Sequence, residues 1–193
     1  MPWNTPGPAV TDNRMTMAPV PRQPLRTDRL LLRPTKAADA ARAFEIQSDW
    51  EVTRMLAQAS FPPDRQEIER WFADHPNEWA AGSAYRFAVV LDGRMAGLVD
   101  VDGIGGGAGS LGYWFERAAW GRGYAFEAAR AVTRFVSGDV GLVKLVAGHA
   151  QDNPASGRVL AKLGFRRVDT VDLFSRSRNE YISQCRYDRL DER

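Results

Sequence analysis

Apolar residues along the chain alternate between short unbroken runs and segments in which they recur every three or four positions. The first run, RLLLR at residues 29–33, ends at Pro34 and predicts a strand, because proline cannot donate to a sheet ladder. Residues 36–49 carry apolar positions near helical spacing and predict a helix. A second helix is predicted over residues 64–75, where Asp64 is a favourable N-cap and the apolar residues form one stripe.

The centre of the chain predicts a β-hairpin and then a β-α-β unit. Two β-rich runs within residues 85–101 flank Asp92 and Gly93, a two-residue hairpin signature. We expect residues 102–110 (DGIGGGAGS) to form a loop that leads into a strand, SLGYWF, at residues 110–115. A helix, a strand at residues 142–148 (LVKLVAG), a short helix and two strands at residues 165–174 and 179–190 follow. The order β-α-α-β-β-β-α-β-α-β-β predicts a mixed α/β (α+β) domain with much antiparallel pairing.

Length and composition narrow the domain organisation. Residues 1–24 are rich in proline and show no apolar period, so we expect a flexible arm there. Residues 25–193 are long enough for a single domain with a sizeable core. The apolar share of 44% and the charged share of 26% are those of an ordinary globular protein. The net charge of only +2 does not indicate a nucleic-acid-binding surface.

The cysteine and histidine counts limit the possible disulfide bonds and metal sites. Cys185 is the only cysteine, so no disulfide can form within the chain, and a reduced, cytoplasmic compartment is expected. Its strand-like surroundings predict a small buried residue. Two histidines and one cysteine at these spacings do not predict a metal site, and His75 is expected on the surface. No apolar run approaches the roughly 20 residues that a membrane helix needs.

A glycine-rich turn opens the central helix, in the stretch WGRGYAFEAARAV at residues 120–132. Backbone N–H groups from Arg122 to Phe126 would be free first-turn donors, and the helix dipole adds positive charge there. Glycines 121 and 123 would let a pyrophosphate approach the backbone, and Arg122 could add a charged contact. A plain strand-to-helix turn is the alternative. The GK[ST] ending of a P-loop is missing, and Phe126 stands where a dinucleotide fingerprint needs a small residue.

A second constellation, DNPASGRVLAKLGF at residues 152–165, predicts a complete short helix. Asn153 fits the N-cap, Pro154 the first helical position and Gly164 the stop. A capping role alone would therefore explain Asn153, and Ser156 is an ordinary first-turn residue.

Together these two motifs, in this order and spacing, resemble the GCN5-related N-acetyltransferase (GNAT) superfamily. Within it the chain is most similar to the ribosomal-protein N-acetyltransferase-like (RimJ/RimL) group. The stretch LRTDRLLLRP at residues 25–34 resembles the opening strand of that group. The resemblance extends over about residues 25–190 and implies the GNAT fold, a mostly antiparallel twisted sheet whose fourth and fifth strands splay apart. Here those strands would be SLGYWF and LVKLVAG. It also implies a homodimer, which is common in this family.

The resemblance further implies acetyl-CoA as co-substrate and assigns residues to it. The glycine turn would bind the pyrophosphate through Gly121, Arg122, Gly123, Tyr124, Ala125 and Phe126. The backbone of the preceding strand would pair with the pantetheine arm at Tyr113, Trp114 and Phe115. Asn153 would face the pantetheine and thioester region, and Ser156 would lie near the departing sulfur.

The implied reaction is direct attack of an amine on the thioester, which needs an acid and a base. Ser156 is the candidate acid. The group often has a glutamate where this chain has Ser110, so His149 becomes an attractive base, although a structural histidine at a strand end is the more ordinary explanation. The remaining carboxylate options, which are weaker, are Asp100, Asp102 and Glu116.

The acceptor is a primary amine, either a protein N-terminus or a small molecule, by the same resemblance. We expect specificity to reside in residues 36–80, whose aromatics could line a pocket or pack in the core, and in residues 168–187. Arg176 and Arg178 would favour an acidic acceptor unless they form a solvated basic loop. A non-catalytic acyl-CoA-binding sensor or interaction module is the alternative function. A nucleotide-binding oxidoreductase fragment is opposed by the antiparallel hairpin at Asp92 and Gly93.

Overall fold

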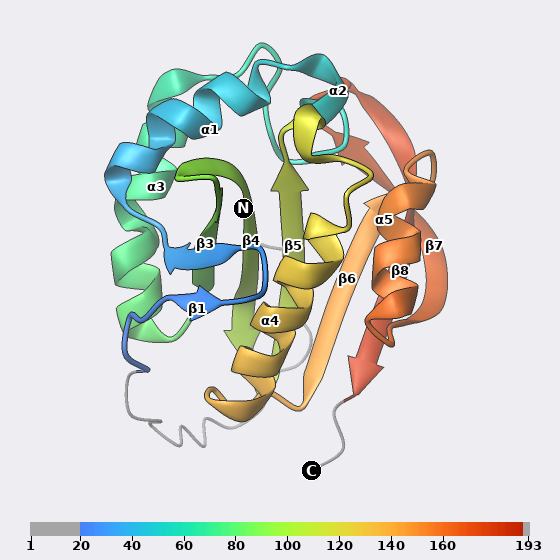
Figure 1. Cartoon of the computed structure of the whole chain (residues 1–193). Helices are drawn as coiled ribbons and strands as arrows, with labels where there is room; N and C mark the ends of the chain where they lie inside the picture. The colour runs from blue at the N-terminus through green and yellow to red at the C-terminus, as the bar shows by residue number, and fades with distance from the viewer. Residues whose placement is uncertain (1–19, 191–193) are drawn as a thin grey trace.

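A computed structural model describes residues 20–190 (Figure 1). Its strands are β1 (Leu25–Arg26), β2 (Leu31–Pro34), β3 (Tyr85–Leu91), β4 (Arg94–Gly105), β5 (Ala108–Phe115), β6 (Lys144–Ala150), β7 (Arg166–Ser175) and β8 (Glu180–Leu190). Its α-helices are α1 (Ala40–Gln47), α2 (Trp50–Thr53), α3 (Arg65–Ala81), α4 (Tyr124–Gly138) and α5 (Pro154–Lys162). Short 3₁₀ turns cover Ala37–Asp39 and Arg117–Ala119.

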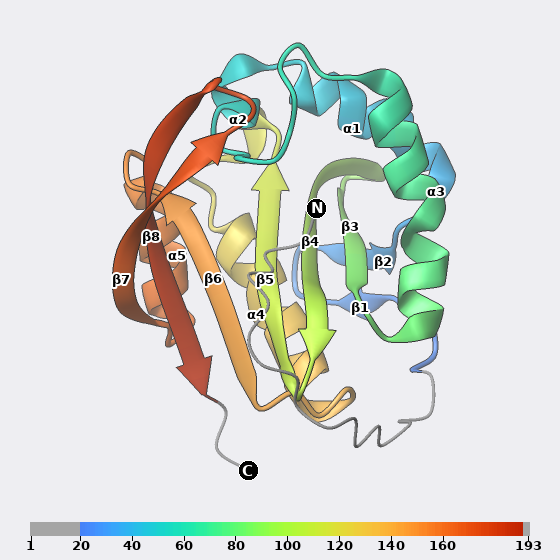
Figure 2. The ribbon, with the colours of Figure 1, turned by 180° about the vertical axis from the view of Figure 1, so that it is seen from behind.

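All eight strands form one sheet in the order β1-β2-β3-β4-β5-β6-β8-β7. Only β5 and β6 pair in parallel, and every other neighbouring pair is antiparallel. Helices α4 and α5 cover one face of the sheet (Figure 1). Helices α1 and α3 lie together at one side of the other face, which is toward the viewer in Figure 2. The mixed α/β architecture with a mostly antiparallel sheet confirms the predicted fold class.

Two clusters of buried side chains hold these layers together. The larger one joins α4 to the sheet and includes Val99, Leu111 and Val132, each less than a twentieth exposed. The smaller one lies on the opposite face, where Phe72 of α3 packs with Leu98 of β4. Because both faces of β4 are buried, its centre is apolar without strict alternation, as expected for a sheet sandwiched between helices.

The feature that matters most for function is the divergence of β5 and β6. The two strands pair only over Ala108–Lys144, Gly109–Leu145 and Ser110–Val146. Beyond Ser110, β5 runs on to Phe115 beside β4 alone, and β6 runs on to Ala150 beside β8 alone. The splayed strands expected from the resemblance are therefore present, at the positions that the sequence predicted.

Three local predictions need correction. The expected loop at residues 102–110 is mostly strand, because Gly106 and Gly107, both with positive φ, turn the chain within two residues. The second helix does not stop at residue 75 but continues through Pro76 to Ala81, where Trp79 is buried in the core. His75 consequently lies inside α3 with 2% exposure rather than on the surface, and burial lowers its pKa to about 3.

The predicted N-terminal arm, residues 1–24, falls mainly outside the described residues, which begin at Val20. Within the described part, the Val20 carbonyl accepts a hydrogen bond of 2.7 Å from the Trp79 indole. Arg22 donates to the Thr35 carbonyl at 2.6 Å and lies over the Trp79 ring. Residues 20–22 thus pack against α3 and the end of β2.

Candidate active site

The glycine turn leads from the end of β5 into α4. Gly121 and Gly123 have φ of +73° and +80°, a conformation that residues with side chains rarely adopt. Gly123 is the N-cap of α4, and no side chain caps the helix there. Residues 120–123 are exposed, so the first N–H groups of a 15-residue helix stand at the surface. This backbone geometry suits an anion such as a pyrophosphate.

Arg29 holds the turn in place from a distant part of the sequence. Its guanidinium donates to the Arg122 carbonyl at 3.0 Å and to the Glu127 carboxylate at 2.7 Å. It also lies 4.7 Å from the centre of the Tyr124 ring. Thr27 donates a second hydrogen bond of 2.6 Å to Glu127. These contacts fasten the segment before β2 to the first turn of α4, and no local sequence pattern predicts them.

The N-terminus of α5 lies beside the unpaired part of β5. The Asn153 side chain accepts from the Ser156 N–H at 3.2 Å, so its predicted capping role is confirmed. The Tyr113 hydroxyl lies 2.8 Å from the Ser156 hydroxyl and 3.2 Å from the Ser156 carbonyl. Burial raises the pKa of Tyr113 to about 12, so its phenol stays protonated. Ser156 and Tyr113 therefore form a hydroxyl pair that can pass a proton across the gap.

His149 lies on β6 and faces the α5 side of the sheet. Its Nδ1 is 2.8 Å from the Ala150 carbonyl, and its Nε2 is 3.2 Å from the Tyr187 hydroxyl. The ring is buried beneath Gly157, whose Cβ, if it had one, would lie 2.7 Å from Nε2. Both nitrogens thus have protein partners, which is the environment of a structural histidine. A role for His149 as base stays a prediction.

A cleft of about 1220 Å³ opens on the face of the sheet opposite α4. Its floor is formed by the side chains and glycines of β4, β5, β6 and β8 that point away from α4, and residues 55–60 form part of its rim. The cleft also touches Tyr113, Ala147 and Tyr187, which pack in the core on the α4 side. It therefore extends to the edges of β5 and β6 where these two strands diverge.

One corner of this cleft is strongly charged. Arg86 of β3 forms ion pairs with Asp100 and Asp102 of β4, and it binds Glu78 of α3 through two hydrogen bonds of 2.6 and 2.9 Å. The ring of Trp71 lies 5.0 Å from the guanidinium. Three carboxylates thus surround one buried guanidinium, leaving an excess of negative charge.

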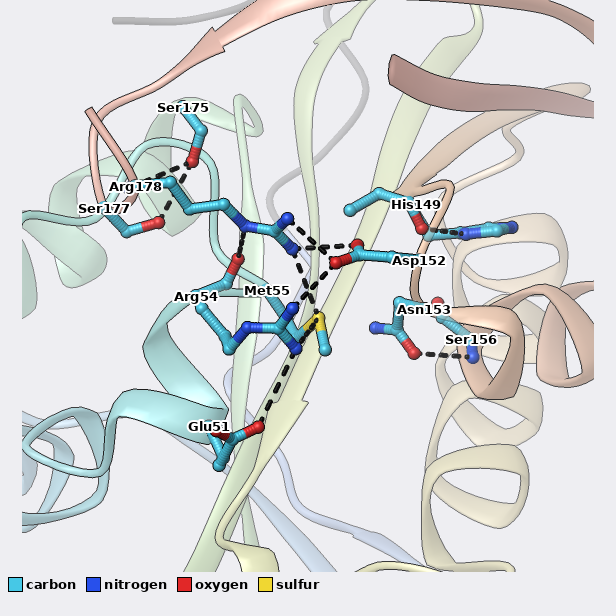
Figure 3. Close-up of polar contacts among 11 residues, drawn as sticks. Glu51, Arg54, Met55, His149, Asp152, Asn153, Ser156, Ser175, Ser177 and Arg178 are labelled. Carbon is cyan, nitrogen blue, oxygen red and sulfur yellow. Dashed lines mark hydrogen bonds and ion pairs between the residues drawn. The ribbon is translucent and has the colours of Figure 1, made fainter. Parts of the chain in front are cut away.

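A second network fixes the loop before α5 (Figure 3). Asp152 accepts hydrogen bonds of 2.9 Å from two nitrogens of Arg178 and one of 2.7 Å from Arg54. Arg178 also donates to the Arg54 carbonyl at 2.7 Å. The neighbouring Arg176 pairs with Glu67 at 2.8 Å. Both arginines of the β7–β8 turn therefore form ion pairs within the protein, and a role for them in binding an acidic acceptor stays a prediction.

The remaining candidates are distributed as follows. Trp114 of β5 lines the cleft, whereas Phe115 is buried and its carbonyl accepts from the Trp120 indole at 2.9 Å. Cys185 is buried, as predicted. Among the early aromatics, Phe72 and Trp79 are core residues, and only Trp71 lines the cleft. Within residues 20–190 no cluster of metal-ligating side chains occurs, and no helix is long and apolar enough to cross a membrane.

Comparisons with known proteins agree with this geometry. A family model described as "Acetyltransferase (GNAT) domain" matches residues 29–166. The uncharacterized N-acetyltransferase YnaD of Bacillus subtilis (strain 168) is 26% identical over 171 residues, which cover 87% of this chain and 97% of that protein. The structure of RimL, a ribosomal L7/L12 alpha-N-protein acetyltransferase in complex with coenzyme A, superposes with a TM-score of 0.78 at 17% identity over 87% of this chain and 98% of its own. The ribosomal-protein-S5-alanine acetyltransferase of Vibrio fischeri gives 0.78 at 18% identity, over 88% and 97%.

Proposed function

Because this chain belongs to the GNAT acetyltransferase family and is an N-acetyltransferase that uses acetyl-CoA, we propose that it acetylates a primary amine bound in the cleft opposite α4. The family expected from the two sequence motifs is thereby confirmed. The residues present fit the co-substrate, which supplies the acetyl group as a reactive thioester. An uncapped helix start with two left-handed glycines suits its pyrophosphate, and an unpaired strand edge suits its pantetheine amides.

A single observation carries this proposal: the cleft is lined by β5 and β6 at the point where these two strands diverge. The glycine turn and α5 lie on one face of the sheet (Figures 1 and 2), and the residues that line the open cleft lie on the other face. Two reactants that enter from opposite faces can therefore meet in the gap. Holding them within near-attack distance accounts for a large share of the rate in bimolecular reactions.

The chain's own residues then have separate tasks. The backbone of Tyr113, Trp114 and Phe115 pairs with the pantetheine arm, and the turn from Gly121 to Phe126, with Arg122, binds the pyrophosphate. Asn153 holds the N-terminus of α5, so that Ser156 stays beside the gap. Ser156 donates a proton to the departing sulfur and is resupplied by the Tyr113 hydroxyl, 2.8 Å away.

We assign the acceptor to the amino terminus of a peptide or protein, in preference to a small amine. The cleft volume of about 1220 Å³ exceeds the roughly 300–1,000 Å³ of a typical small-molecule site. The two structures compared above are named as enzymes that modify ribosomal proteins, which supports the same assignment.

The test measures thiol release from acetyl-CoA with purified protein. The acceptors are tripeptides that begin with serine, alanine or methionine, together with spermidine and kanamycin as small amines. Turnover with peptides and little with small amines is the expected result. Coenzyme A binding with no turnover on any amine would instead favour the non-catalytic module, and acetylation of small amines alone would overturn the peptide assignment.

Two further expectations belong to the same proposal. A cytoplasmic location is supported by the single reduced cysteine, Cys185. A homodimer is supported by large apolar side chains exposed on the outer hairpin, among them Phe174 and Tyr181, whose rings lie 5.5 Å apart. Light scattering on a size-exclusion column distinguishes a mass of one chain from that of two.

A further inference from the structure

We propose that Asp100 binds the ammonium group of the acceptor and removes its proton, and this inference rests on the proposed amine acceptor. The sequence placed Asp100 among the weaker options for the base, because it lies on β4 rather than on a splayed strand. In the structure, the position of Asp100, the orientation of its carboxylate and the charges around it favour it as the base.

The position of Asp100 follows from the register of three strands. Arg86, Asp100 and Gly112 stand opposite one another on β3, β4 and β5. Gly112 is two residues beyond Ser110, the last residue of β5 that pairs with β6. Asp100 is therefore one strand away from the point where the gap opens, on the face that carries the cleft.

Gly112 leaves the space that the carboxylate needs. A Cβ at Gly112 would lie only 2.7 Å from Oδ1 of Asp100, so any side chain there would push the carboxylate away from the gap. Because β5 presents no side chain at this point, Oδ1 lies over the part of β5 that does not pair with β6. An amine approaching a thioester held along β5 would pass this oxygen.

Arg86, on the neighbouring strand β3, sets the orientation of the Asp100 carboxylate. Arg86 pairs with Oδ2, and within residues 20–190 it supplies the only hydrogen bond to the Asp100 carboxylate. Arg86 is itself fixed by the two hydrogen bonds that it donates to Glu78 and by the Trp71 ring. Oδ1 is consequently left as an acceptor for a donor from the cleft. Arg86 and Glu78 act as positioning residues.

The charges around Asp100 favour a cationic donor to its carboxylate. The groups that face Asp100 are Arg86 from β3, Glu78 from α3 and Asp102 from β4. The corner thus contains three carboxylates and one guanidinium, and a cation entering it would reduce the imbalance. Burial raises the pKa of Asp100 to about 7, while Arg86 opposes this shift and Asp102 and Glu78 add to it. A base with a pKa near neutrality is well matched to proton removal at cellular pH.

The step balances without any further reactant. The ammonium gives one proton to Oδ1 of Asp100 and becomes a neutral amine. Its nitrogen forms a bond to the acetyl carbon, and the bond from that carbon to sulfur breaks. The sulfur leaves with a proton from the Ser156 hydroxyl. The second amine proton and the proton held by Asp100 leave to water, and water returns one proton to the pair formed by Ser156 and Tyr113. The net products are an amide, a thiol and one proton.

The kinetic test compares two isosteric substitutions at neighbouring carboxylates, Asp100→Asn and Asp102→Asn. The acceptor is the panel amine with the highest wild-type turnover. For the wild type, kcat/KM should fall as the pH drops through about 7, because the base must be deprotonated. Asp100→Asn should lose about 100-fold in kcat/KM at pH 8 and lose this acidic limb. Asp102→Asn should raise KM by about threefold and keep the limb. An Asp100→Asn enzyme with wild-type rate and pH profile would overturn the inference and leave the transferase activity standing.

A second measurement needs no turnover and uses the wild-type protein with coenzyme A. The ¹³Cγ resonance of Asp100 is titrated with pH in the presence of n-butylammonium or of tetramethylammonium, which has no N–H donor. We expect n-butylammonium alone to lower the pKa of Asp100, because a hydrogen-bonded cation favours the carboxylate. An unchanged titration with n-butylammonium would refute the ammonium site, even if no acceptor had been found.

Discussion

Replacing Gly121 by alanine tests whether the glycine turn binds the pyrophosphate or only turns the chain. Gly121 has φ of +73°, and nothing in the protein lies within 4 Å of the position a Cβ would take. The substitution therefore causes no clash, and its cost to folding is the backbone cost of a left-handed residue, roughly 1–2 kcal/mol. For a chain of this size we expect Tm to fall by about 2–4 °C per kcal/mol.

Gly93 is a matched control for this backbone cost. It sits in the β3–β4 hairpin with φ of +78°, and it too has nothing within 4 Å of a Cβ. Gly93→Ala should destabilise the protein about as much as Gly121→Ala. Only Gly121→Ala should change coenzyme A binding, because a methyl group or a shifted backbone there would disturb donors to the pyrophosphate. Loss of one charge-assisted hydrogen bond, about 1.5–3 kcal/mol, corresponds to at least a tenfold increase in Kd.

The assay is isothermal titration of wild type and both variants with coenzyme A and with pantetheine, which has the thiol arm but no pyrophosphate. Pantetheine should bind all three proteins with the same Kd. If coenzyme A also bound Gly121→Ala and Gly93→Ala with equal Kd, the turn would be a plain strand-to-helix connection, and the assignment of its N–H groups would be refuted.

Three further predictions follow from contacts at the site. Arg29→Ala frees the Arg122 carbonyl and should raise the Kd of coenzyme A about tenfold by titration, with pantetheine unaffected. Arg178→Ala removes the hydrogen bonds to Asp152, a partly exposed pair, so chemical denaturation should show a loss of about 1–2 kcal/mol and kinetics a higher acceptor KM. Ser156→Ala should lower kcat about tenfold to 100-fold without changing coenzyme A affinity, and an unchanged kcat would exclude Ser156 as the acid.

The elements that the sequence predicted well are those with strong local signals. The hairpin at Asp92 and Gly93 forms as expected, and α5 begins at the cap Asn153. The four-residue helix α2 was not predicted, because one turn is too short to show a period. Helix α3 passes through Pro76, and the tertiary packing of Trp79 outweighs the lost hydrogen bond of the proline.

The contacts that build the site are of another kind. Arg29 and Glu127 are 98 residues apart, and Arg178 lies 26 residues from Asp152 and 124 from Arg54. No local pattern in one sequence indicates such pairings, because each residue alone looks like an ordinary surface charge. Motif resemblance located the glycine turn and the splayed strands, yet it gave no ranking of the carboxylates. That ranking depends on register, since only the pairing of Asp100 with Gly112 places a carboxylate at the gap.

The proposed mechanism separates the two proton transfers of the reaction in space. Asp100 lies on the cleft face with the acidic corner behind it, whereas Ser156 and Tyr113 lie on the α5 side of the gap. In this proposal the amine loses its proton toward the cleft face, and the sulfur receives its proton from the α5 side of the gap. The divergence of β5 and β6 would then bring the amine and the thioester together while a different group serves each of them in proton transfer.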